Sequence, residues 1–143
     1  MSEGIPPTVL VVDDDPDFVV FVAAALEEEG YRVVPACDGV EALEIARRTP
    51  PDLVTLDLQM PRKTGVLFYR QFKADPRLRS VPVVIITGLR QANSYTAPFV
   101  DAFFEFKDPN IPKPNTFLDK PFTAEKLLAV VRTVLAASPG ANT

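Results

Sequence analysis

Short apolar segments recur along the chain and predict buried strands. Residues 9–12, 53–56 and 83–86 are runs of four residues in which valine, leucine and isoleucine dominate. Segments this short and this apolar are typical of strands that are buried on both faces of a sheet. Residues 31–36 and 117–118 predict two further strands, so the pattern indicates five strands.

The intervals between the predicted strands carry apolar residues at helical spacing and begin with helix-capping patterns. Asp15 stands before a proline, and Asp38 stands three residues before Glu41, so each aspartate is expected to cap a helix. Further helices are predicted after a loop through 63–65 and after a cap at Thr123. Strands that alternate with helices favour an α/β fold, a doubly wound parallel sheet with helices on both faces.

The length of the chain fits a single domain. We expect residues 1–143 to form one unit, with a core over about 8–137 and a flexible tail at 138–143. The sequence of the tail resembles a linker as readily as a true terminus.

The interval between the fourth and fifth strands is longer than one loop, one helix and one loop require. It covers residues 88–116, where several prolines interrupt regular structure. We expect a short helix over 97–106 and an extended loop over 107–116. The interval also holds aromatic residues that must pack on the sheet or against a partner. These are Phe99, Phe103, Phe104 and Phe106.

Polar side chains follow four of the predicted strands. Asp13 and Asp14 follow the first strand, Asp57 the third, Thr87 the fourth and Lys120 the fifth. Because the carboxyl ends of parallel strands lie at one edge of a sheet, we expect these groups to converge there. Neighbouring carboxylates repel one another unless a cation lies among them, and oxygen ligands without histidine suit Mg²⁺. A carboxylate nucleophile, a divalent cation, a lysine and a hydroxyl form a set suited to phosphoryl transfer.

Each of these signals is weak by itself. An acidic triplet before a helix is often a cap, an aspartate after a strand is often a turn residue, and a lone lysine is usually a surface residue. Their combination, in this order and each at a strand end, favours a phosphoryl-transfer site.

The motifs resemble those of the response regulator receiver domain of two-component signalling. The resemblance extends over about residues 8–135. The matching segments are residues 11–14 (VVDD), Asp57 with Met60, Pro61 and Gly65, residues 85–88 (IITG) and residues 120–122 (KPF). The resemblance implies a flavodoxin-like strand order, 2-1-3-4-5.

The resemblance also implies roles for the converging residues. Asp57 would accept a phosphoryl group from a phosphohistidine on a partner histidine kinase or histidine phosphotransfer protein. Asp14 would bind Mg²⁺ directly, Asp13 would bind it partly through water, and Gln59 would bind it through its backbone carbonyl. Lys120 would pair with a phosphoryl oxygen, and its peptide bond to Pro121 is expected to be cis.

A switch is part of the same resemblance. After phosphorylation the hydroxyl of Thr87 would bind a phosphoryl oxygen, and Phe117 on the fifth strand would follow into the vacated space. A downstream protein would then read the changed surface. The chain would catalyse its own phosphorylation and dephosphorylation without being a turnover enzyme on an external substrate. The long interval 88–116 puts the dimer that is common in the family in doubt, and dimerisation is left open.

Composition excludes several classes of function. The net charge of −4 and the sequence pI near 4.8 argue against a nucleic-acid surface. No apolar run approaches the roughly 18 residues of a membrane span, and there is no histidine for metal or acid–base chemistry. The single cysteine, Cys37, suits a reducing cytoplasm and is expected to be a small buried residue.

Three other functions would use some of the same features. A receiver-like scaffold would keep the fold without being phosphorylated. A haloacid-dehalogenase-like phosphatase would use Asp13 and Asp15 as an Asp-x-Asp signature, although Asp17 stands where that family has threonine or valine. The phosphorylated residue, Asp13 or Asp57, distinguishes the phosphatase from the receiver. A flavin carrier would need a Gly/Ser/Thr-rich phosphate loop, which is missing after the first strand.

Overall fold

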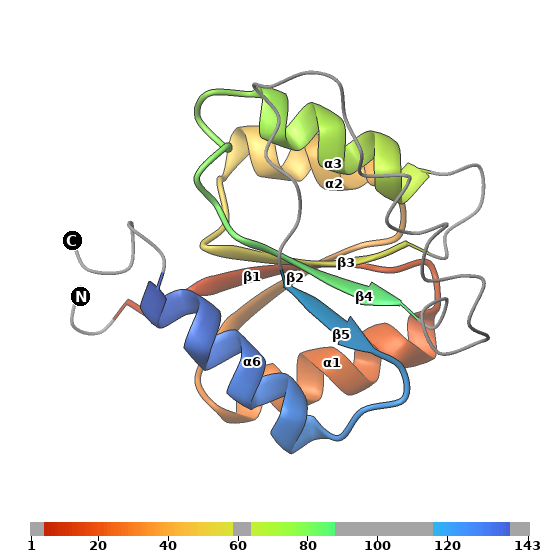
Figure 1. The fold of residues 1–143 in the computed structure, drawn as a ribbon, viewed down its shortest axis with the longest axis vertical. Coiled ribbons are helices and arrows are strands. Elements are labelled where there is room, and N and C mark those ends of the chain that lie inside the picture. Colours follow the sequence, from red (N-terminus) through yellow and green to blue (C-terminus); the bar gives the residue numbers. More distant parts are fainter. Residues whose placement is uncertain (1–4, 59–63, 88–115, 138–143) are drawn as a thin grey trace.

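Five parallel strands form one sheet at the centre of the molecule. In the computed structural model, which describes residues 5–58, 64–87 and 116–137, the strand order is β2-β1-β3-β4-β5 (Figure 1). The strands are β1 (Thr8–Val12), β2 (Arg32–Ala36), β3 (Leu53–Asp57), β4 (Val83–Thr87) and β5 (Phe117–Asp119). Each neighbouring pair is parallel. The predicted fold class and strand order are therefore confirmed.

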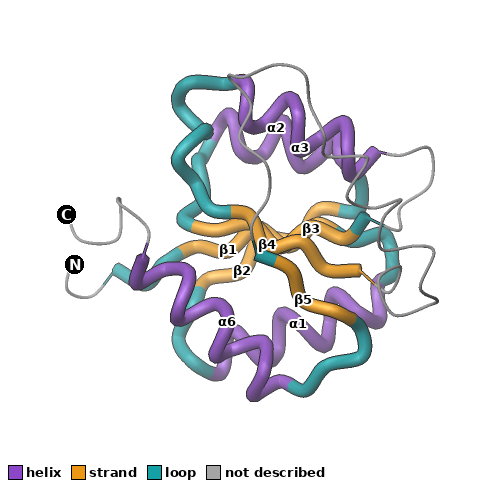
Figure 2. The backbone as a smooth tube through the Cα atoms, in the orientation of Figure 1, coloured by secondary structure: helices purple, strands orange, loops and turns teal. Residues whose placement is uncertain are grey.

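Helices cover both faces of this sheet. They are α1 (Pro16–Glu28), α2 (Gly39–Arg48), α3 (Thr64–Ala74) and α6 (Ala124–Ala137). Helices α2 and α3 lie side by side on one face, and α1 and α6 lie on the other (Figure 1, Figure 2).

The two faces of the sheet bury separate apolar clusters. Leu10 and Ile85 belong to the cluster beneath α2 and α3, whereas Val11 and Val84 belong to the cluster beneath α1 and α6. Successive residues of a strand point to opposite faces, so both faces of β1 and β4 are apolar. This two-sided burial accounts for the short, uninterrupted apolar runs in the sequence.

Helix caps turn the chain away from the sheet at the expected positions. Asp15 accepts hydrogen bonds from two backbone N–H groups in the first turn of α1. Asp38 Oδ1 accepts one from the N–H of Glu41 at 2.8 Å, and Thr123 Oγ1 accepts one from the N–H of Lys126 at 3.1 Å. These bonds satisfy N–H groups that have no partner within the helix.

Two local predictions are wrong. Helix α3 begins at Thr64, where a loop was predicted through 63–65. Cys37 was expected to be buried but is exposed, because it lies beyond the last residue of β2, where the chain leaves the sheet. A hydrogen bond to Glu41 and the charge of that carboxylate raise the pKa of the Cys37 thiol, which disfavours the reactive thiolate.

Several predictions fall outside the described residues. They are Gln59, the helix over 97–106 with its aromatic residues, most of the loop over 107–116, and the tail at 138–143. The single-domain boundaries stay a prediction. Among the helices that the structure describes, none has both the length and the apolar character of a membrane span.

Candidate functional site

Three carboxylates meet at the carboxyl edge of the sheet. Asp13 follows β1 directly, and Asp57 is the last residue of the adjacent strand β3. Oxygen atoms of Asp13, Asp14 and Asp57 all lie within 4.8 Å of one another. Asp13 and Asp57 are buried, whereas Asp14 is exposed to solvent. The parallel order of β1 and β3 is what brings these distant residues together.

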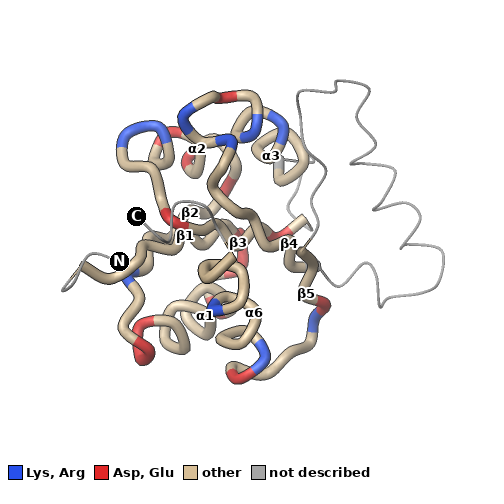
Figure 3. Tube along the Cα trace, turned by 60° about the vertical axis from the view of Figure 1, so that its left-hand side comes forward, with Lys and Arg blue, Asp and Glu red and all other residues tan. Residues whose placement is uncertain are grey.

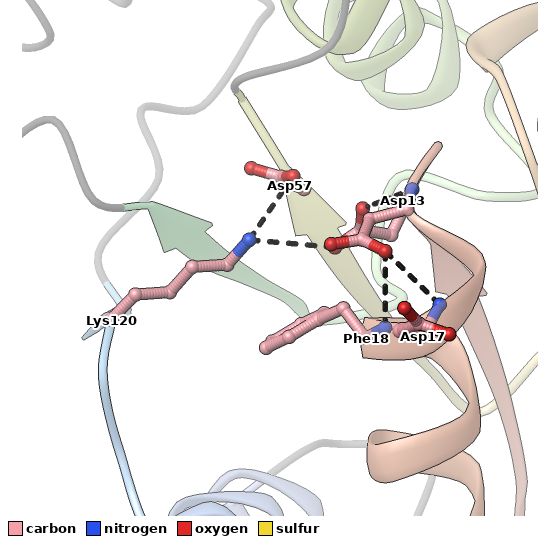
Figure 4. Close-up of polar contacts among 6 residues, drawn as sticks. Asp13, Asp17, Phe18, Asp57 and Lys120 are labelled. Carbon is pink, nitrogen blue, oxygen red and sulfur yellow. Dashed lines mark hydrogen bonds and ion pairs between the residues drawn. The ribbon is translucent and has the colours of Figure 1, made fainter.

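Lys120 reaches the same place from the loop after β5. Its Nζ lies 3.4 Å from Asp57 Oδ2 and 3.7 Å from Asp13 Oδ2 (Figure 4). The Lys120–Pro121 peptide bond is cis, as the resemblance implied. The site therefore combines a buried carboxylate pair with one ammonium group, and the carboxylate of Asp14 lies at its solvent side.

Asp13 is held in an environment that disfavours its charge. Its Oδ1 accepts a hydrogen bond from the N–H of Asp15 at 2.9 Å, but its Oδ2 accepts none from the described residues. Burial raises the pKa of Asp13 to about 6; the negative charge of Asp57 adds to this rise, while the Asp15 N–H and Lys120 oppose it.

A divalent cation fits these carboxylates. The Oδ2 of Asp13 is buried without a hydrogen bond, the pKa of Asp13 is raised, and three carboxylates face a single ammonium group, so negative charge is in excess at this place. Hard oxygen ligands with an open, solvent-facing side suit Mg²⁺, which keeps several of its waters.

Three other residues are predicted for the site: Thr87, Phe117 and Gln59. Thr87 ends β4 in register with Asp119, so it is at the same edge of the sheet. Phe117 on β5 is partly buried against the cluster beneath α2 and α3. Gln59 lies outside the described residues. The roles expected of these three residues stay predictions.

Phe18 is a site residue that the sequence reasoning missed. It was assigned to the apolar face of a helix, yet Lys120 Nζ lies over its ring, 4.0 Å from the ring centroid (Figure 4). One signal was available, because Phe18 is on the first turn of the helix that follows Asp14. The pairing with Lys120 depends on the tertiary fold and has no signature in the local sequence.

Comparison with known proteins identifies the family. Residues 9–106 match the model of the response regulator receiver domain. The chain belongs to this family. Receiver domains are signalling modules that interact with histidine kinases or phosphotransfer proteins and bind Mg²⁺ in an acidic pocket.

Relatives of known sequence and structure agree with this assignment. The DNA-binding dual master transcriptional regulator RpaA of Synechocystis sp. is 33% identical over 129 residues, which cover 90% of this chain and 49% of RpaA. Protein Rrf1 of Nitratidesulfovibrio vulgaris is 31% identical over 132 residues, 92% of this chain and 85% of Rrf1. The structure of the Vibrio cholerae chemotaxis protein CheY4 matches with a TM-score of 0.74 and 27% identity, over 91% of this chain and 99% of CheY4. This receiver domain thus spans about half of RpaA but nearly all of CheY4.

Proposed function

We propose that this receiver domain accepts a phosphoryl group on Asp57 from a phosphohistidine of a histidine kinase or histidine phosphotransfer protein. The observation that carries the proposal is the convergence of Asp13, Asp14, Asp57 and Lys120 at one edge of the sheet. Asp57 is the better acceptor candidate, because the resemblance to receiver domains gives it this role and Lys120 Nζ lies nearer to its Oδ2, at 3.4 Å, than to Asp13 Oδ2, at 3.7 Å.

The proposed step is an in-line displacement. An oxygen of Asp57 attacks phosphorus, the bond between phosphorus and the imidazole nitrogen breaks, and its electron pair stays with the imidazole. Lys120, 3.4 Å from Asp57 Oδ2, is suited to neutralise charge on the phosphoryl oxygens during transfer. Attack by water on the aspartyl phosphate would later release inorganic phosphate and restore the carboxylate.

Mg²⁺ is the proposed cofactor. Asp13, Asp14 and the backbone carbonyl of Gln59 would hold it beside Asp57. When bound, the ion would neutralise charge on the transferred phosphoryl group. The carboxylates by themselves would repel a negatively charged donor, so phosphorylation is expected to require the ion.

The response to phosphorylation is proposed to pass through Thr87 and Phe117. The Thr87 hydroxyl would bind a phosphoryl oxygen, and Phe117 would then move toward the site. A downstream protein that reads this change is the expected partner, and the cytoplasm is the proposed location. Dimerisation through the region around 88–115 stays open.

The test is intact mass after incubation with acetyl phosphate and Mg²⁺. We expect one added phosphoryl group on the native chain and none on Asp57→Asn, because an amide oxygen is a poor nucleophile for phosphorus. Glu44→Gln, on the exposed side of α2, is the matched control and should be phosphorylated like the native chain. Chelation of Mg²⁺ should abolish the adduct.

Other outcomes would point to the alternatives. An adduct that persists in Asp57→Asn and maps to Asp13 would favour a phosphatase-like nucleophile. The structure offers little support for that chemistry, since Asp15 is occupied as the cap of α1. No adduct on the native chain would favour the unphosphorylated scaffold.

A further inference from the structure

The ammonium group of Lys120 lies between two kinds of neighbour. On one side are the carboxylates of Asp57 and Asp13, at 3.4 and 3.7 Å. On the other side is the face of the Phe18 ring, 4.0 Å from Nζ to the ring centroid. The negative face of an aromatic ring attracts a cation, and the attraction grows when the pair is shielded from water. The Lys120 side chain is about one quarter exposed, with a relative accessibility of 24%.

The ring itself is fixed by contacts on several sides. It packs edge-on against Phe122, with centroids 5.7 Å apart and ring planes at 88°, and lies 6.0 Å from Phe21. Phe122 lies two residues after Lys120, so the loop that delivers the lysine also holds the ring. The backbone N–H of Phe18 is bound by the cap residue Asp15. The start of α1 and the loop after β5 are thereby joined at Phe18.

At such a site the ammonium group of the lysine must be held in position while its N–H donors stay available for the phosphoryl oxygens. Its stem has several rotatable bonds, and its three N–H donors can turn toward any acceptor. A ring face restrains the ammonium group but accepts no conventional hydrogen bond, so the donors stay directed at the carboxylates and at any oxygen that arrives beside Asp57. A polar neighbour in the same place would compete for those donors.

We propose that Phe18 is a positioning residue for phosphorylation, and that its ring face holds the Lys120 ammonium group over Asp57 in the orientation that receives the phosphoryl oxygens. The inference rests on the proposed phosphorylation of Asp57. By this inference, the first turn of α1 affects the rate of phosphorylation as well as packing the helix on the sheet.

The test separates the electronic character of the ring from its bulk. Site-specific replacement of Phe18 by 3,4,5-trifluorophenylalanine keeps the shape of the ring but removes most of the negative charge from its face. We expect the rate constant for phosphorylation by acetyl phosphate, at fixed Mg²⁺, to fall about threefold to tenfold. The rate constant of Phe18→Leu should fall at least as far. That of Phe18→Tyr, which keeps the ring face, should stay close to the native value.

Two controls show whether the effect passes through the lysine. Val20→Ala removes an exposed apolar side chain of the same helix and should leave the rate within about twofold of the native value. In a Lys120→Met background, Phe18→Leu should cause no further loss of rate. The ring is proposed to affect the rate only through the Lys120 ammonium group, which this background lacks.

The outcomes distinguish this inference from the function on which it rests. If the native chain is not phosphorylated, the proposed function fails. If the native chain is phosphorylated and the trifluorinated variant reacts equally fast, Phe18 only packs and the inference is overturned. The inference is also overturned if Phe18→Leu lowers the rate equally in the native chain and in the Lys120→Met background.

Discussion

At the scale of single residues, the site places buried carboxylates beside one ammonium group. Asp13 is 2% exposed, and its carboxylate shares a small space with Asp57 and one ammonium group. Burial makes the ionised form of Asp13 unfavourable in the folded protein, which is why its pKa rises from 3.8 to about 6. The geometry that is proposed to attract a cation therefore has a cost in stability when no cation is present.

Asp13→Asn is expected to make the metal-free protein more stable. Asparagine keeps an oxygen for the N–H of Asp15 but carries no charge, so the cost of a buried anion disappears. The free energy of unfolding at pH 7 without Mg²⁺ should rise by about 1 to 3 kcal/mol. Urea unfolding in the presence of a chelator measures it. A loss of stability would show that Asp13 contributes more as the partner of Lys120 than it costs as a buried charge.

At the scale of elements, one buried lysine joins the end of α3 to the turn that leads into β4. Lys73, near the end of α3, is 7% exposed, and its Nζ donates hydrogen bonds to the carbonyls of Arg79 at 3.0 Å and Val81 at 2.5 Å. Arg79 Nε donates in return to the carbonyl of Lys73 at 3.0 Å. The turn between α3 and β4 is closed by these bonds. Burial lowers the pKa of Lys73 to about 8.

The buried Lys73 should make the free energy of unfolding depend on pH in the alkaline range. Its pKa is about 8 in the folded protein and near 10.5 when exposed, so the unfolded chain binds more protons between these values. Relative to Lys73→Met, the free energy of unfolding of the native chain should rise by about 2 kcal/mol from pH 7 to pH 9.5.

Urea unfolding of both proteins at the two pH values measures this difference. Arg48→Met, in the exposed last turn of α2, removes a positive charge that does not titrate in this range and serves as the control. A difference between native chain and Lys73→Met that is independent of pH would contradict the prediction.

At the scale of the whole molecule, charge is unevenly distributed over the described residues (Figure 3). Basic residues gather at the last turns of α2 and α3, whereas acidic residues occupy the carboxyl edge of the sheet and the start of α1. Such an edge attracts cations from solution. A cation bound there would contact Asp57 at the end of β3 and Asp13 and Asp14 in the loop between β1 and α1, so it would stabilise the folded state as a whole.

Mg²⁺ is expected to raise the midpoint of thermal unfolding. At a concentration about ten times its dissociation constant, a ligand that binds only the folded state adds about 1.4 kcal/mol, or roughly 4 °C for a chain of this size. The rise should be smaller at pH 5.5 than at pH 7.5, because the Asp13 pKa of about 6 lets protons compete with the metal below that value.

Circular dichroism at equal ionic strength measures these shifts, with Asp13→Asn as the variant expected to lose most of the response. Equal shifts at both pH values would mean that Asp13 is not a ligand.

The two wrong predictions have a common physical origin. Capping patterns and prolines predicted the starts of α1, α2 and α6, because hydrogen bonds within a few residues decide them. The start of α3 at Thr64 and the exposure of Cys37 depend on how the chain leaves a strand end, which neighbouring residues do not determine. Gln59 and the predicted helix over 97–106 lie outside the described residues, so both stay predictions.

The sequence by itself determined the strands, their parallel arrangement and the residues of the acidic edge. Apolar runs indicate strands that are buried on two faces, and polar residues at strand ends indicate the edge of the sheet where the parallel strands end. Only the tertiary structure decided the surroundings of each group: the raised pKa of Asp13, the buried ammonium of Lys73 and the ring of Phe18 beneath Lys120. These depend on distances between residues far apart in the chain, and those distances are set by the packing of helices and strands rather than by any local pattern.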